Sequence, residues 1–282
     1  MKEIAPDILI ETDYEGVTLG AIRTPVGVVM VDTPLNPKDS MAWRAICSRS
    51  AGGSDRLLVL LDEHTDRLSG ASGMKCPIIV HERTAQSLTS RPSSSRAQAY
   101  GSSLDWEDIP EPVNTRGVHP EITFTSAMAI NWGEEPILLE HHPGPSRGCT
   151  WVIAPEKQVA FIGDTVTPGQ PPFMASADID TWLVALHDLQ LARFKDFILI
   201  SGREDMVTSD DIKDLEKFLK KAGRKLDKLI SSGVKADEAE KLGVEMTADF
   251  RARNKRESDQ FKSRLALGFG QYFVSHISKK SD

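Results

Sequence analysis

Four short apolar runs in this sequence each end abruptly in a cluster of polar residues, and this repeated pattern constrains the fold more than any other feature. The apolar runs cover 57–61, 137–140, 158–162 and 197–200, and the polar clusters that follow them cover 62–67, 140–146, 163–165 and 201–204. Runs of this length and composition are typical of buried β-strands. Strand ends in layered α/β proteins direct side chains into the crevice where ligands bind. We therefore expect the four clusters to line one shared crevice.

The order of the predicted elements favours a layered α/β protein. In the first third of the chain we expect strands at 8–12, 27–32, 57–61 and 76–81, and helices near 39–51 and 82–88. From Ile122 onward apolar residues alternate with polar ones, which predicts a second, antiparallel sheet that begins with 122–130. A helix capped by Asp180 and a final buried strand at 197–200 follow.

The C-terminal part predicts helices packed on this core. Thr208 and Asp211 form a capping-box pattern at the start of a long amphipathic helix that ends at Gly233. A second, strongly charged helix is expected from Ala236 to Lys255, and its basic residues from Arg251 onward are interpreted as a solvated helix face. We accordingly divide the chain into a core at 1–208 and a helical extension at 209–282 that packs on the same domain.

Aromatic residues gather in the last segment of the chain. They are Phe261, Phe269, Tyr272 and Phe273. A group this apolar is unfavourable in water, so it predicts either packing within the chain or a homodimer contact.

Composition excludes several classes of function. The chain of 282 residues carries 34 basic and 41 acidic side chains, so a net charge of −7 argues against a broad nucleic-acid-binding surface. The three cysteines, Cys47, Cys76 and Cys149, are widely spaced and predict neither a disulfide framework nor a zinc knuckle. Acidic residues interrupt the N-terminal segment and no run reaches about 18 apolar residues, so we expect a cytoplasmic protein without a membrane partner.

The first polar cluster contains candidate metal ligands. Asp62, His64 and Asp66 occupy alternate positions, which lets three side chains converge in an extended or tightly looped segment. Imidazole and carboxylate groups together suit zinc, iron or manganese. The alternative is a solvated turn with an ion pair to Arg67.

Taken together, these segments resemble the metallo-β-lactamase fold hydrolases. The resemblance runs from about Ile8 to Gly233, and it follows six segments that occur in the family's order: VVMVDTP, LVLLDEHTDRLSG, IIVHE, HHPGPSRGC, FIGDT and ISGRED. It implies a four-layer αββα sandwich with a metal site at one end of the strands. In the family, loops such as 89–118 and 168–177 would select among ester, thioester, lactone and other substrates.

The sequence departs from the family's metal motifs at four positions. Histidine is expected where this chain has Asp62, Arg67, Pro145 and Arg203. Only His64, Asp66 and Asp164 keep the expected residue types. Arginine stays protonated and cannot ligate a metal. We therefore expect Arg67 and Arg203 to replace the metal with fixed positive charge, which predicts a largely degraded metal site, no bound cofactor, and a protein that acts by binding an unknown small-molecule ligand or a partner.

Two alternatives stay open. In the first, Asp62, His64 and Asp164, with His142 as a weaker candidate, hold a single zinc or iron ion, and Asp66 is the general base of a hydrolase. In the second, Gly144 to Gly148 matches G-x-S-x-G, which would make Ser146 the nucleophile of a metal-free serine hydrolase. That motif requires a sharp turn from a strand into a helix, whereas the residues after Ser146 predict a strand.

Overall fold

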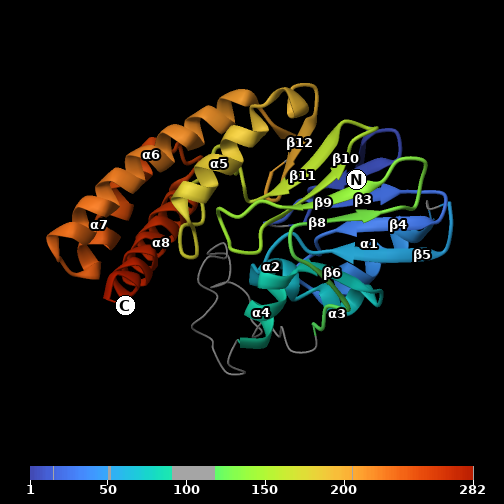
Figure 1. Ribbon diagram of the computed structural model, residues 1–282, viewed down its shortest axis with the longest axis horizontal. Helices are drawn as coiled ribbons and strands as arrows, with labels where there is room; N and C mark the ends of the chain where they lie inside the picture. The colour runs from blue at the N-terminus through green and yellow to red at the C-terminus, as the bar shows by residue number, and fades with distance from the viewer. Residues whose placement is uncertain (15, 50–51, 91–117, 205, 282) are drawn as a thin grey trace.

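The computed structural model describes residues 1–14, 16–49, 52–90, 118–204 and 206–281. Two β-sheets lie face to face, and helices cover the outer face of each (Figure 1). A cluster of buried apolar side chains from both sheets fills the space between them. This is the αββα sandwich that the sequence predicts. The proposed selector loop at 89–118 lies almost entirely outside the described residues.

The first sheet has seven strands, and their order in space is their order along the chain. The strands are β1 (Lys2–Ala5), β2 (Ile8–Glu11), β3 (Leu19–Arg23), β4 (Gly27–Val31), β5 (Asp55–Val59), β6 (Ile78–His81) and β7 (Ile122–Phe124). Strands β1 to β4 pair antiparallel, whereas β4 to β7 pair parallel. The parallel half places the carboxyl ends of β4, β5 and β6 at one edge of the sheet, where polar side chains can meet.

The second sheet has six strands in the order β13-β12-β11-β10-β9-β8. The strands are β8 (Ala127–Ile130), β9 (Ile137–His141), β10 (Thr150–Ala154), β11 (Val159–Gly163), β12 (Ile198–Ser201) and β13 (Met206–Val207). Among its described strands, β11 and β12 pair parallel and the other neighbours pair antiparallel. The short β13 was not expected, because the sequence indicated β12 as the last strand.

One strand prediction was wrong about its sheet. The segment from Ile122 was expected to open the second sheet, but β7 pairs parallel with β6 in the first sheet and the second sheet begins with β8. The alternation of apolar and polar residues continues from β7 in the first sheet to β8 in the second, because Phe124 and Ile130 both point into the core between the two sheets. Periodicity reports which face is buried, and it does not report which neighbour a strand has.

The described helices that cover the first sheet are α1 (Pro37–Arg49), α2 (Thr65–Leu68), α3 (Ala71–Met74) and α4 (Glu82–Ser90). Helix α1 begins two residues before the expected Asp39, with Pro37 at its first position, where the missing N–H of proline is harmless. The segment after β5 was expected to be extended or tightly looped, and Asp66 and Arg67 instead lie within the short helix α2.

In the part of the chain that the structure describes, the second sheet is covered by α5 (Ile179–Leu189), α6 (Ser209–Ser232), α7 (Ala236–Met246) and α8 (Lys255–Ser281). The cap of α5 is Asp178, whose side chain accepts a hydrogen bond from the Thr181 N–H, and not Asp180 as predicted. The capping box of α6 at Thr208 and Asp211 is confirmed, as is its end at Gly233.

The charged C-terminal helix is shorter than predicted. Helix α7 ends at Met246, and a 3-10 turn (Thr247–Asp249) and the segment 250–254 lead into α8. Arg251 and Arg253 therefore precede a helix and do not lie on one.

The aromatic residues of the last segment pack within the chain. Phe261, Phe269, Tyr272 and Phe273 are all buried, and the last three join the cluster between the second sheet and its helices. Their burial does not require a second copy of the chain. The homodimer therefore stays a prediction, but these aromatic residues no longer support it.

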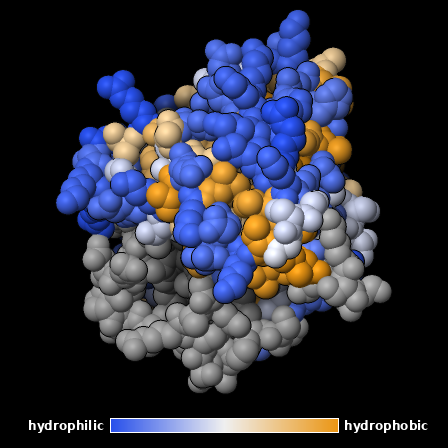
Figure 2. Space-filling model, turned by 90° about the vertical axis from the view of Figure 1, so that its left-hand side faces the viewer, coloured by the Kyte–Doolittle hydropathy of each residue, from blue (hydrophilic) through white to orange (hydrophobic). Residues whose placement is uncertain are grey.

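Figure 2, which faces the helical side, shows mainly hydrophilic residues with separate apolar patches between them. Among the described residues, no helix combines the length and apolar character needed to cross a membrane.

Candidate functional site

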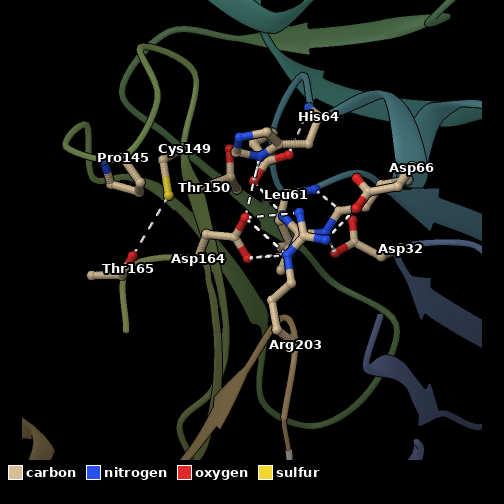
Figure 3. Close-up of polar contacts among 12 residues, drawn as sticks. Asp32, Leu61, His64, Asp66, Pro145, Cys149, Thr150, Asp164, Thr165 and Arg203 are labelled. Carbon is tan, nitrogen blue, oxygen red and sulfur yellow. Dashed lines mark hydrogen bonds and ion pairs between the residues drawn. The ribbon is translucent and has the colours of Figure 1, made fainter. Parts of the chain in front are cut away.

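Polar side chains from both sheets meet at the ends of their strands. Asp32 follows β4, the pair Asp62 and His64 follows β5, Asp164 follows β11, and Arg203 follows β12. Except for His64 and Arg203, which retain slight exposure, these side chains are wholly buried. Three of the four predicted polar clusters thus share one site (Figure 3).

Arg67 lies at the centre of the site and has no exposed surface. Its Nη1 donates to Asp62 Oδ2, and its Nη2 donates to Asp164 Oδ1. Its Nε lies 3.1 Å from Asp32 Oδ2, an ion-pair distance without hydrogen-bond geometry. One guanidinium therefore contacts three buried carboxylates that come from both sheets.

Arg203 approaches the same carboxylates from the second sheet. Its Nε lies 3.1 and 3.2 Å from the two oxygens of Asp164, and its Nη2 donates to Asp164 Oδ2 at 3.1 Å. Its Nη1 donates to Asp66 Oδ2 and, at 2.9 Å, to the carbonyl oxygen of Gly16. Paired hydrogen bonds of this kind between arginine and carboxylate are the strong, geometrically specific form of the interaction.

His64 completes the group of cationic side chains. Its Nδ1 lies 2.9 Å from Asp62 Oδ2 and 3.3 Å from Asp164 Oδ2. Its ring also lies 5.3 Å from the ring of the buried Phe173. Burial by itself lowers the pKa of His64, but the two carboxylates outweigh burial and raise it. The site thus favours a protonated imidazole.

The carboxylates respond differently to this environment. Burial raises the pKa of a carboxyl group, but Arg67 and His64 outweigh it at Asp62 and hold that pKa well below its usual range. At Asp164 burial is again outweighed, by Arg203 and Arg67, which lower its pKa to about 2. At Asp32 burial dominates over the attraction of Arg67 and raises the pKa to about 7. Of these three carboxyl groups, Asp32 therefore holds a proton most readily.

The backbone around the site makes room for the arginines. A Cβ on Gly202 would lie 2.3 Å from Arg67 Nη2, so only glycine fits at this position. The carbonyl oxygen of Gly202 accepts a hydrogen bond from the Thr18 N–H at 2.9 Å, which fixes the turn before Arg203. Asp32 itself has a φ of 58°, and its Oδ1 accepts from the Leu61 N–H at 2.9 Å. Contacts such as these hold the turns from both sheets in one arrangement.

The remaining predicted residues do not join the arginine contacts. Pro145, at an expected histidine position, lies apart from them with Cys149, whose Sγ is near the Thr165 hydroxyl (Figure 3). His142 stacks on Trp151, with ring centroids 3.5 Å apart, and its Nε2 lies 3.2 Å from Glu140 Oε2. His142 is thus placed away from Asp62, His64 and Asp164 and is not part of their group.

Ser146 does not have the setting of a nucleophilic serine. Its side chain is buried. The residues after it lead directly into strand β10, without the helix that the G-x-S-x-G motif needs. The serine hydrolase alternative lacks its defining local structure.

Three residues nevertheless have the donor types of a metal site. One ligand atom from each of Asp62, His64 and Asp164 can be chosen such that all lie within 4.8 Å of one another. The same carboxylates also accept hydrogen bonds from Arg67 and Arg203. The structure therefore contains both a possible metal-binding group and cations that already occupy its oxygens.

Sequence reasoning missed two members of this site. Asp32 was included only as the last residue of the predicted strand 27–32. It follows β4 just as Asp62 follows β5, and this parallel could have revealed it. Phe173 was included only in the loop at 168–177 that the family resemblance assigns to substrate selection. Its ring contacts two arginines: the guanidinium carbons of Arg203 and Arg264 lie 4.4 and 4.3 Å from the ring centroid.

Comparison with known proteins identifies the family. The sequence profile of the metallo-beta-lactamase superfamily matches residues 64–233, which is more than half of the chain. The chain belongs to the metallo-beta-lactamase superfamily. No curated protein matches it in sequence.

Solved structures show the same fold at low sequence identity. A metallo-beta-lactamase from Pontibacter korlensis has a TM-score of 0.62 and 18% identity, over 78% of this chain and 97% of that one. A metallo-beta-lactamase family protein from Thermus thermophilus has a TM-score of 0.67 and 15% identity, over 99% and 95% of the two chains. A stereoselective inverting sec-alkylsulfatase from Pseudomonas sp. has a TM-score of 0.68 and 12% identity, over 99% of this chain but only 51% of that one.

Proposed function

We propose that this chain is a metallo-β-lactamase-fold protein in which two arginines take the place of the metal centre, and that it acts by binding a small-molecule ligand. The observation that carries the proposal is the contact of Arg67 and Arg203 with the carboxylate oxygens of Asp62 and Asp164. Those oxygens are the ones that a metal ion would need.

The donor set does not fit a two-metal centre. Arginine stays protonated, offers no lone pair to a metal and repels a divalent cation nearby. Buried carboxylates without a partner are strongly destabilising, so the loss of a metal requires another cation in its place. Arg67, Arg203 and His64 supply positive charge next to Asp62, Asp66 and Asp164. We assign no catalytic step to a metal in this arrangement.

Elemental analysis and thermal melting test the proposal. Protein purified without an affinity tag or chelator is expected to carry no stoichiometric zinc, iron or manganese, and its melting temperature is expected not to change in EDTA. Zinc, ferrous iron or manganese added to the chelated protein should leave the melt unchanged, because Arg67 and Arg203 occupy the ligand oxygens.

A His64→Asn variant separates binding at this site from adventitious binding to other histidines. Near-stoichiometric metal and a melt that EDTA lowers, both lost in His64→Asn, would overturn the proposal. A metal effect that persists unchanged in His64→Asn arises elsewhere on the chain and leaves the proposal standing.

A second candidate function is a hydrolase with a single metal ion. The clustering of ligand atoms from Asp62, His64 and Asp164 favours it. A bound zinc or iron ion would supply Lewis-acid chemistry toward an ester, thioester or lactone-type substrate. Asp66 would then be the general base, although its Oδ2 now accepts from Arg203. The same metal measurements decide between the two candidates.

The proposal also covers the class of ligand, the cellular location and the oligomeric state of the protein. A net charge of −7 supports a small-molecule ligand over a nucleic acid. A cytoplasmic location and a homodimer remain part of the proposal, and light scattering of the purified protein measures the second.

A further inference from the structure

A cavity of about 270 Å³ lies next to the buried arginine site, between the turn that carries Arg203 and the start of α8. Arg203 belongs to its lining, so the cavity and the site share a wall. The charged side chains of the lining are Arg203, Arg253, Arg256, Arg264, Glu204 and Glu257. Four positive groups thus face two negative ones in a chain whose overall charge is negative.

Two of these arginines are buried and held in place. Arg203 and Arg264 both pack against the ring of Phe173, each with its guanidinium carbon less than 4.5 Å from the ring centroid. The Nη1 of Arg264 also donates to Gln170 Oε1 at 3.1 Å and to the Pro171 carbonyl oxygen at 3.0 Å. Positions fixed in this way lower the entropy lost when a ligand binds.

The two acids of the lining are themselves paired. The Gln170 side-chain amide donates to Glu204 Oε1. Glu257 lies 2.7 Å from Arg253 Nη2, and it accepts a further hydrogen bond from the Arg253 backbone N–H. Each carboxylate therefore has a donor next to it, which reduces its repulsion of an incoming anion.

The first turn of α8 adds to the positive potential of the cavity. Helix α8 begins at Lys255, and Arg256, Glu257 and Gln260 near its start belong to the lining. The N-terminal end of a helix carries a partial positive charge and suits anionic groups. Its effect here adds to that of the arginines.

We propose that this cavity binds the oxyanion group of a small molecule. Guanidinium groups match the oxygens of phosphate, sulfate and carboxylate with paired donors. The inference deepens the proposed function and rests on it, because it names the chemical class of the ligand that the site would bind. Arg203 belongs to both the cavity and the buried site, because it lines the cavity and also contacts Asp66 and Asp164.

Calorimetric titration with inorganic phosphate tests the inference. The full-length protein is treated with EDTA, freed of it by gel filtration and then titrated at constant ionic strength, with chloride as the replaced anion. We expect saturable binding that weakens about tenfold or more in Arg256→Gln and in Arg264→Gln, because each loses a charge-assisted contact. Arg256 is exposed, so its variant is expected to fold even if the variant of the buried Arg264 does not.

Arg251→Gln is the matched control. Arg251 is exposed, lies in the same segment and is not part of the lining, so the variant removes the same charge from outside the cavity. It should bind phosphate as the parent protein does. Absence of saturable binding by the parent, or equal weakening in Arg251→Gln and Arg256→Gln, would overturn the inference.

Phenyl phosphate, titrated in the same way, distinguishes the two sources of such an oxyanion. Tighter binding of the ester than of inorganic phosphate supports an organic ligand, and the reverse order supports the free ion. Because the titrated protein has been freed of metal, the titration reports on the arginines even if metal analysis shows that the proposed function is wrong.

Discussion

At the scale of single residues, the charged side chains of the site could be predicted from the sequence, but their environment could not. Arg67 and Arg203 do contact Asp62, Asp66 and Asp164, as their replacement of expected histidines suggested. The pairing geometry, the inclusion of Asp32 and the role of Phe173 depend on distances between segments far apart in the chain. Residue type alone carries no information about such distances.

The central role of Arg67 predicts a large effect on stability. Arg67→Met should lower the free energy of unfolding by about 3–5 kcal/mol, because it leaves Asp62 and Asp164 buried without this partner. Arg193→Met is the matched control, since Arg193 pairs with Glu140 while about half exposed, and exposed pairs contribute about 0–1 kcal/mol. Urea denaturation of the three proteins measures both values. Equal losses in the two variants would contradict the central role of Arg67.

At the scale of elements, most helices and strands were predictable because their apolar periodicity is local. The capping box of α6 was correct for the same reason, since Thr208 and Asp211 are three residues apart. The wrong assignments depend on the surrounding fold. The sheet to which β7 belongs is decided by pairing with β6, and the helical form of α2 is decided within a polar segment without apolar periodicity.

The turn between β12 and β13 gives a prediction at this scale. Gly202→Ala should destabilise the protein by about 1–3 kcal/mol, because its Cβ would clash with the buried guanidinium of Arg67. Gly133→Ala is the control: its Cβ would lie 3.6 Å from the nearest atom, the Glu135 carbonyl oxygen, and the change should stay within about 0.5 kcal/mol. Thermal melts of both variants check the difference. A neutral effect of Gly202→Ala would mean that the turn can move away from Arg67.

At the scale of the whole molecule, the buried charges make stability depend on pH. The pKa of Asp32 is raised from 3.8 to about 7, so the folded state retains a proton that the unfolded chain has lost between these values. Stability from this group is therefore present below pH 4, declines as pH rises toward 7, and is level above. The lowered pKa values of Asp62 and Asp164 act in the opposite direction, and their stabilisation is lost as pH falls below about 4.

Asp32→Asn tests this pH dependence. The variant should flatten the decline in unfolding free energy between pH 4 and pH 7, where a single group contributes at most about 1.4 kcal/mol per pH unit. Asp196→Asn removes an exposed carboxyl group and should leave the profile unchanged. Urea denaturation at several pH values gives the slopes, and an Asp32→Asn profile parallel to that of the parent would contradict the assignment.

The packing of α8 has a consequence for the boundaries of the protein. The family profile ends at residue 233, yet Leu265, Phe269 and Phe273 belong to the same buried cluster as Trp151 and Leu186. The region that matches the family profile is thus shorter than the region that forms the hydrophobic core. A protein shortened to the matched region would lack the part of its hydrophobic core that α8 supplies. It would also lack the arginines that α8 contributes to the cavity.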